Sequence, residues 1–249
     1  MTVTPDVIVV PYGVDSWSIE ELVVNRSGNG AISVDASFPC AAIDKSNKKP
    51  LRLNSEVFSV APNFNAPQGA TPLTLLSDHL KGLCRTWDRL SLRFLDGYFA
   101  HIANMLGVHR DVIATKLAPF AGLYVAEDWT FSAPKPLPRA HLYAPHNTSA
   151  SLDTEDFVQA DFVQVDFAFW LGERMVAVLA KPGTLTPARA NERLARLEQA
   201  DVVTVHFTAQ DIEKEPEALF DRIIGDFGAL IDNVGIVPIS PFRPRISSE

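Results

Sequence analysis

The segment between Phe162 and Lys181 constrains the fold of this chain more than any other part of its sequence. Two apolar runs, Phe162–Trp170 and the run that begins at Arg174, flank a short turn that contains Gly172. Both runs are rich in valine, and the first is also rich in phenylalanine. Runs of this length and composition, separated by a glycine-containing turn, are typical of a β-hairpin. We therefore predict two antiparallel strands in this segment.

The residues after the hairpin predict a helix, a strand and a second helix. Thr186 suits an N-cap and Pro187 the first helical position, so we expect a helix that ends at Ala200. Val202–Phe207 is a continuous apolar run, which favours a strand buried in a sheet. Pro216 opens a segment with apolar residues at helical spacing. This order predicts an α/β fold in which helices flank a mixed sheet.

A proline-rich stretch divides the chain. Residues 132–139 include three prolines, and residues 145–151 are mostly polar. This composition is typical of linkers and surface loops. We expect a linker or long loop at 132–152, an N-terminal region at 1–131 and the α/β domain at 153–249.

The N-terminal region combines two kinds of pattern, which predict an α+β arrangement. Strand-like alternation and turn-forming residues dominate the first 65 residues, whereas residues 73–118 show helical spacing, with a cap at the polar residues 77–78. Residues 95–118 are similar to a helix-turn-helix, in which Gly107 would supply the positive φ of the turn. An ordinary helical hairpin is the alternative, because any helix–glycine–helix corner gives this pattern.

The net charge of −8 argues against a protein whose whole surface binds a polyanion. Residues 78–145 nevertheless contain eight basic residues against six acidic ones, whereas the chain from residue 146 onward contains nine against seventeen. Any nucleic acid would therefore bind the middle third of the chain. The candidate residues for this contact are Arg85, Arg89, Arg93, Arg110 and Lys116. A solvated helix face is the alternative interpretation of the same arginines.

The bulk properties are those of a globular protein without membrane segments. About 47% of the residues are hydrophobic and 21% are charged. No apolar run reaches the roughly 18 residues that span a bilayer, and the N-terminus lacks the pattern of a signal peptide. Cys40 and Cys84 have no metal-ligand spacing, so we expect buried thiols in a reducing cytoplasm and no membrane partner.

The order of hairpin, helix, strand and helix resembles the restriction-endonuclease-like superfamily, and within it the very-short-patch-repair-like proteins. Val165–Ala168 looks like the strand that bears the family's first aspartate. Residues 189–197 followed by 203–207 are similar to the next helix and strand, and residues 209–224 to the closing segment. The resemblance covers about a quarter of the chain. It implies metal-assisted hydrolysis of nucleic acid, in which an aspartate and an acid-x-lysine element hold Mg²⁺.

The resemblance assigns roles to two residues and leaves one role unfilled. Asp166 matches the first aspartate, which makes it the expected metal ligand, and Lys181 matches the catalytic lysine. The acid two residues before that lysine falls at Leu179, which has no oxygen to offer a hard cation. Glu173 and Asp161 are the candidates for an acid supplied from elsewhere. Because Leu179 stands at the position of the second acid, we expect a degenerate catalytic site.

The leading hypothesis from the sequence is a catalytically degenerate nuclease-fold protein that acts in nucleic-acid binding or assembly. One alternative is an active Mg²⁺-dependent nuclease with a relocated acid. A second is a non-enzymatic module that binds a protein partner, and a third is a metabolic enzyme on an unrelated α/β fold. The sequence has no glycine-rich nucleotide loop and no nucleophile-elbow motif.

Overall fold

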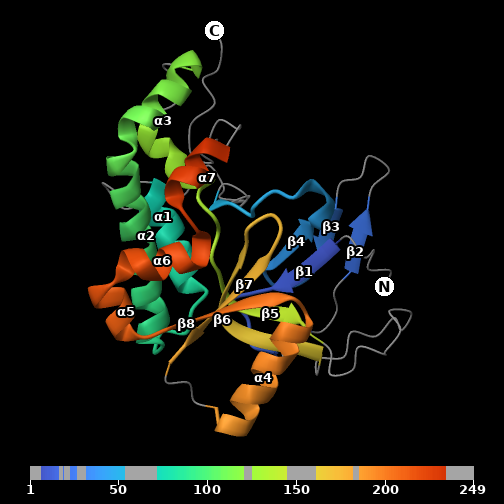
Figure 1. Ribbon diagram of the computed structural model, residues 1–249. Coiled ribbons are helices and arrows are strands. Elements are labelled where there is room, and N and C mark those ends of the chain that lie inside the picture. The colour runs from blue at the N-terminus through green and yellow to red at the C-terminus, as the bar shows by residue number, and fades with distance from the viewer. Residues whose placement is uncertain are drawn as a thin grey trace.

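A four-stranded mixed sheet lies at the centre of the computed structural model (Figure 1). The described residues are 7–16, 19, 23–26, 32–53, 72–120, 125–144, 161–181 and 185–233. The strands follow the order β5 (Leu137–Tyr143), β6 (Phe162–Trp170), β7 (Met175–Ala180) and β8 (Val202–Phe207). β5 pairs with β6 and β6 with β7 in antiparallel orientation, whereas β8 is parallel to β7. The predicted α/β class, with a mixed sheet flanked by helices, is confirmed.

The predicted hairpin is confirmed as β6 and β7, which pair from Phe167 with Val178 to Trp170 with Met175. Gly172 in the connecting turn has a φ of 93°, and a Cβ atom there would lie 2.4 Å from the backbone oxygen of Lys48. Only glycine tolerates both this conformation and this close approach. The hairpin register is therefore set partly by its turn.

The connection from β7 to β8 runs through helix α4 (Pro187–Gln199), which begins as the sequence predicts, with Thr186 as N-cap and Pro187 in the first turn. The strand that follows, β8, differs from its prediction. It lies at the edge of the sheet and is only half-buried, with Val203 43% exposed. The apolar run reflects burial of alternate residues such as Val205 and Phe207 against one face of the sheet.

Helices cover both faces of the sheet. One face is covered by a group that Figure 1 shows together at one side of the molecule. This group consists of α1 (Pro72–Gly82), α2 (Arg89–Val108), α3 (Arg110–Leu117), α5 (Ala209–Lys214), α6 (Pro216–Ile224) and α7 (Phe227–Asn233). The other face packs against α4, where Leu197 joins a cluster with Ala177 and Leu179.

Aromatic rings form the centre of the larger core. The ring of Phe94 in α2 stacks on Phe167 at 4.3 Å and lies 4.9 Å from Phe207 and 5.4 Å from Phe220. These contacts join residues on the two sides of the segment 132–152. That segment itself contains β5, which the sequence did not predict as a strand, and its residues 145–152 lie outside the described part of the chain.

The helical region differs from its prediction in two ways. The expected cap at residues 77–78 is wrong, because both residues lie inside α1, which ends at Gly82. Helix α2 is capped instead by Asp88, whose carboxylate accepts from the backbone N–H of Ser91 at 3.1 Å and from its hydroxyl at 2.7 Å. Gly107 lies within the last turn of α2 without positive φ, and His109 alone separates α2 from α3. The positive-φ turn expected at Gly107 is therefore wrong.

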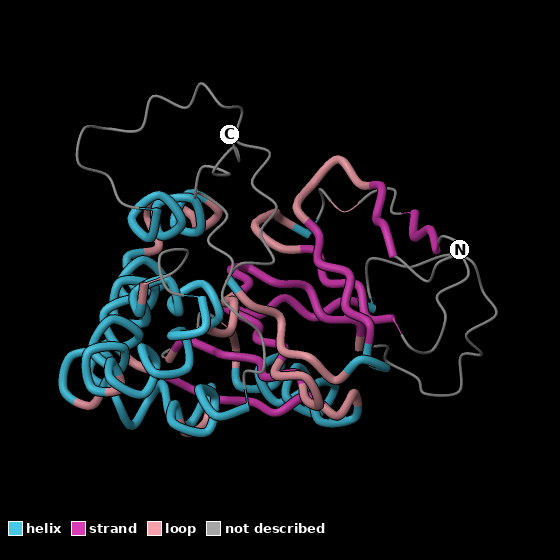
Figure 2. The backbone as a smooth tube through the Cα atoms, turned by 90° about the horizontal axis from the view of Figure 1, so that it is seen from above, coloured by secondary structure: helices cyan, strands magenta, loops and turns pink. Residues whose placement is uncertain are grey.

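The N-terminal strands form two small antiparallel pairs at the end of the molecule opposite α2 and α6 (Figure 2). The strands are β1 (Val7–Pro11) with β4 (Cys40–Asp44), and β2 (Val23–Arg26) with β3 (Ile32–Asp35). Short 3₁₀ helices span Lys45–Asn47, Ala118–Phe120 and Ala126–Ser132. Val10 and Ile43 pack with Leu142 of β5, which attaches the first pair to the sheet.

Both cysteines are free thiols, Cys84 buried and Cys40 half-buried. Burial raises the pKa of each thiol to about 12. Among the described helices, none has the length and apolar character needed to cross a membrane.

Candidate functional site

A cleft of about 470 Å³ lies where α4, the β6 strand and the turn before α2 meet. Eight charged side chains line it: Arg85, Asp88, Arg139, Asp166, Arg189, Glu192, Arg193 and Arg196. Five arginines face three carboxylates, so the lining has an excess of two positive charges although the chain is acidic overall. An excess of positive charge on such a concave surface attracts anions.

Asp166 lies in this cleft at the point where β6 and β7 separate. The pairing of β6 with β7 ends at Phe167 and Val178, so the backbone N–H of Ala180 does not donate to the backbone of β6. One carboxylate oxygen of Asp166 accepts that N–H at 2.8 Å instead. Burial raises the pKa of Asp166, while the Ala180 N–H and the Arg193 guanidinium oppose the rise. The side chain therefore has a structural role in addition to any chemical one.

Leu179 and Lys181 lie on the neighbouring strand and its end. Continuing the β6–β7 register by one pair places Leu179 opposite Asp166, and its side chain is only 5% exposed in the apolar cluster under α4. Lys181 follows β7, is exposed, and donates its backbone N–H to Phe207 at 2.7 Å. Strand alternation puts residues 179 and 181 on the same side. The structure therefore brings Asp166 and Lys181 to the same end of the hairpin.

His206 lies beside this end of the hairpin, since β8 pairs it with Leu179. Burial lowers the pKa of His206, and the positive charges of Lys181 and Arg193 lower it further. The imidazole is therefore neutral near neutral pH. Two cationic side chains, those of Lys181 and Arg193, are therefore near this end of the hairpin.

Glu173 and Asp161, the two candidates for a relocated acid, are not brought together with Asp166. Glu173 is at the hairpin turn, 74% exposed, and pairs with Lys48 at 3.4 Å. It lies beyond Trp170, and the four residue steps from Asp166 to Trp170 span about 14 Å at ~3.4 Å per step. Asp161 precedes β6 by one residue, at the other end of the strand.

The donor set around Asp166 does not fit the Mg²⁺ that the resemblance implies. In the described ranges, no three His, Cys, Asp or Glu side chains are grouped so that they could hold a metal ion. The position of the second acid is occupied by the buried, apolar Leu179. Asp88 is near enough to raise the pKa of Asp166, but both of its oxygens accept hydrogen bonds from Ser91. Mg²⁺ requires oxygen ligands in near-octahedral geometry.

Of the five residues expected to contact nucleic acid, Arg85 alone lines the cleft. Arg85 lies in the turn before α2, so its spacing of four from Arg89 does not continue along one helix. Arg89 is exposed in the first turn of α2. The remaining three contact Glu213 (Arg93, 2.9 Å), Glu127 (Arg110, 2.9 Å) and the backbone oxygen of Ile231 (Lys116, 3.0 Å).

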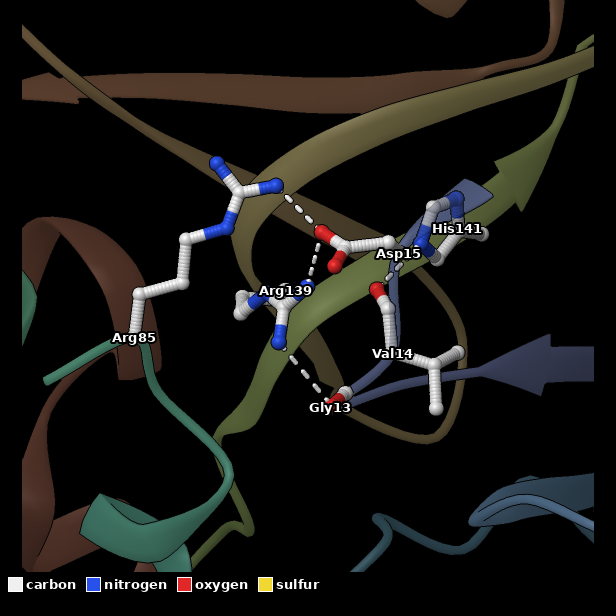
Figure 3. Close-up of polar contacts among 6 residues, drawn as sticks. All are labelled: Gly13, Val14, Asp15, Arg85, Arg139 and His141. Carbon is white, nitrogen blue, oxygen red and sulfur yellow. Dashed lines mark hydrogen bonds and ion pairs between the residues drawn. The ribbon is translucent and has the colours of Figure 1, made fainter. Parts of the chain in front are cut away.

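Asp15 joins two of the cleft arginines (Figure 3). Its carboxylate accepts from the guanidinium groups of both Arg85 and Arg139, and Arg139 also donates to the backbone oxygen of Gly13 at 3.1 Å. The hydrogen bond from Arg85 is the main cause of the lowered pKa of Asp15. Arg139 has a φ of 49°, which is uncommon for any residue other than glycine. The loop after β1 therefore fixes Arg139 and Arg85 in one wall of the cleft.

Two guanidinium donors in the cleft remain unsatisfied. Within the described part of the chain, the Nε atoms of Arg139 and Arg193 are buried without a hydrogen-bond partner. Burial also lowers the pKa of Arg193, although Asp166 opposes this. A buried donor without an acceptor costs about 1–3 kcal/mol. Arginine forks match carboxylate and phosphate oxygens in particular.

Sequence analysis missed most of this cleft. Arg189, Arg193 and Arg196 recur at a spacing of four and three, which places them on one face of α4 and was available as a signal. Arg139 gave no such signal, because prolines precede it and the strand was not predicted. Asp15 is far from all of them in sequence, and only the fold brings it to Arg85 and Arg139.

We compared the chain with family models, curated proteins and solved structures. No family model, no curated protein and no solved structure matches it at a significant level.

Proposed function

We propose that this chain is a restriction-endonuclease-like protein that binds nucleic acid through phosphate contacts in the arginine-lined cleft and does not hydrolyse it with Mg²⁺. The proposal rests chiefly on one observation. Asp166, at the position of the superfamily's aspartate, opens into a cleft with five arginines, whereas the buried Leu179 opposite it occupies the position of the second acid.

The arrangement of elements supports the family part of the proposal. The hairpin of β6 and β7 is followed by α4, the parallel strand β8 and helices α5 and α6. This is the order on which the resemblance rests. Asp166 and Lys181 lie at the same end of the hairpin, as the superfamily's register requires.

The charges of the cleft support the binding part. Polyanions are held mainly by arginine and lysine contacts to phosphates, and such contacts need a local excess of positive charge rather than a basic protein. The cleft has that excess, and two of its buried guanidinium donors lack an acceptor among the described residues. A phosphate group supplies oxygens that match the guanidinium groups of the arginines lining the cleft.

Calorimetry with Mg²⁺ and Mn²⁺, together with fluorescence anisotropy of a labelled oligonucleotide, tests the two parts of the proposal. We expect no metal binding at millimolar concentration, and oligonucleotide binding that persists in a chelator. Asp166→Asn is the appropriate variant, because the amide oxygen can still accept the N–H of Ala180. Metal binding that Asp166→Asn abolishes, accompanied by cleavage of the oligonucleotide, would overturn the proposal.

A further inference from the structure

An exposed tryptophan stands beside the cleft. Trp87 lies in the turn between α1 and α2, and 75% of its surface is exposed. The other described tryptophans, Trp129 and Trp170, are each only 4% exposed. A large aromatic ring that is left in water forgoes the stabilisation of burial, which is worth roughly 2–3 kcal/mol for a large apolar side chain. A single exposed aromatic residue is normal on a protein surface, so its neighbours decide whether it belongs to a binding site.

The position of Trp87 connects it directly to the charged lining. Arg85 and Asp88, which flank it in sequence, both line the cleft. The guanidinium carbon of Arg85 lies 5.8 Å from the centre of the indole ring, within the range of a cation–π contact. The same guanidinium also donates to Asp15. Trp87 does not line the cleft itself, but its contact with Arg85 places the indole next to a residue that does.

We infer that Trp87 and the cleft together take single-stranded nucleic acid, with an unpaired base stacked on Trp87 and the adjoining phosphates held by the cleft arginines. The inference rests on the proposed function and specifies its substrate class. Aromatic side chains beside a positively charged groove are the elements from which single-strand binding sites are built. Bases within a duplex are stacked on one another and are not available to a protein ring, so this combination selects against duplex.

The size and charge of the site agree with one or two nucleotides rather than a long groove. The cleft volume of about 470 Å³ is within the range of pockets that hold a small ligand. The contact chemistry distinguishes neither base identity nor sugar, because stacking is tolerant of sequence and the arginines address phosphate. We therefore expect weak sequence preference and a strong dependence on salt.

Anisotropy of a short fluorescein-labelled oligothymidylate tests the inference with three variants of the full chain. Trp87→Ala should weaken binding about tenfold, in line with the loss of one stacked base. Trp87→Phe should retain most of the affinity, since phenylalanine still stacks. Phe120→Ala is the matched control, because Phe120 is also an exposed aromatic residue but, unlike Trp87, has no sequence neighbour among the residues that line the cleft. A duplex of the same labelled oligothymidylate with oligoadenylate should bind more weakly than the single strand.

The outcomes separate this inference from the proposed function. Equal affinities of wild type and Trp87→Ala for the single strand, or tighter binding of the duplex, would overturn the inference while leaving phosphate binding in the cleft intact. If the wild type binds neither probe, the proposed function and the inference both fail. Loss of binding in Trp87→Ala with retention in Trp87→Phe and Phe120→Ala supports the inference.

Discussion

The carboxylate of Asp166 makes a hydrogen bond that predicts a stability effect independent of any catalysis. Asp166→Ala would leave the backbone N–H of Ala180 without its acceptor, because β6 and β7 have already separated at this point. Loss of the partner of a buried donor costs about 1–3 kcal/mol. The substitution also removes a buried carboxylate whose pKa is raised, and at neutral pH this offsets part of the cost. We expect Asp166→Ala to lower the free energy of unfolding by about 1–3 kcal/mol.

The pH dependence of this effect has a defined sign. Burial raises the pKa of Asp166 in the folded protein, so the folded state binds its proton more readily than the unfolded state. The contribution of this group to stability is therefore greatest below its ordinary pKa and decreases as the pH rises through the raised value. Asp166→Asn carries no ionisable proton, so this component of the pH dependence should disappear in that variant.

Urea denaturation of the wild type, Asp166→Ala and Asp166→Asn measures both effects. With a slope of about 3 kcal/mol per molar urea, the alanine variant should lose roughly 0.3–1 M in its midpoint. The asparagine variant retains an acceptor for Ala180 and should remain within about 1 kcal/mol of the wild type. If the alanine variant is as stable as the asparagine variant, the carboxylate does not have the structural role that its hydrogen bond indicates.

Three further predictions concern the core, the histidines and the hairpin turn. Phe94→Ala should lower the free energy of unfolding by about 3–5 kcal/mol in urea denaturation, because its ring packs at the centre of the aromatic core; a loss below about 1 kcal/mol would contradict this packing. Both ring nitrogens of His101 are buried without a partner in the described structure, and burial lowers the pKa of this residue. The contribution of His101 to stability should therefore be complete above its ordinary pKa and should be lost as the pH falls through the lowered value. His101→Phe should flatten that fall in part, since His141 and His206 have pKa shifts of the same direction; an unchanged pH profile would contradict the assignment. Gly172→Ala should cost more than about 1 kcal/mol, since its φ is positive and a Cβ would meet backbone, and a thermal melt equal to wild type would refute this.

The sequence predicted the part of the fold that depends on local pattern. The hairpin, α4 with its cap and β8 all follow from apolar runs and capping residues within a few positions. β5 was missed because prolines in residues 132–139 indicated a loop, although an edge strand tolerates proline. The break between α1 and α2 was missed because apolar residues continue at helical spacing across it, while Asp88 starts a new helix.

The candidate site was only partly predictable for a related reason. The pairing of one hairpin is a local property, and it puts Asp166 near the end of β7, which Lys181 follows. The arginines of the cleft come from the turn before α2, from β5 and from α4. No local pattern relates these three segments, and Asp15, which pairs with Arg85, comes from a fourth segment. Their convergence is a tertiary property, so sequence reasoning placed the nucleic-acid contact on the helical stripe instead.

The salt dependence of oligonucleotide binding in Arg189→Glu and Arg222→Glu tests the central claim most directly. Arg189 lines the cleft and is exposed, whereas Arg222 is exposed on α6 and does not line it. Both substitutions change the net charge equally, so a general charge effect would weaken both alike. We predict that Arg189→Glu lowers affinity and reduces the slope of log affinity against log salt by about one, whereas Arg222→Glu leaves both near wild type. Equal behaviour of the two variants would contradict phosphate binding in the cleft.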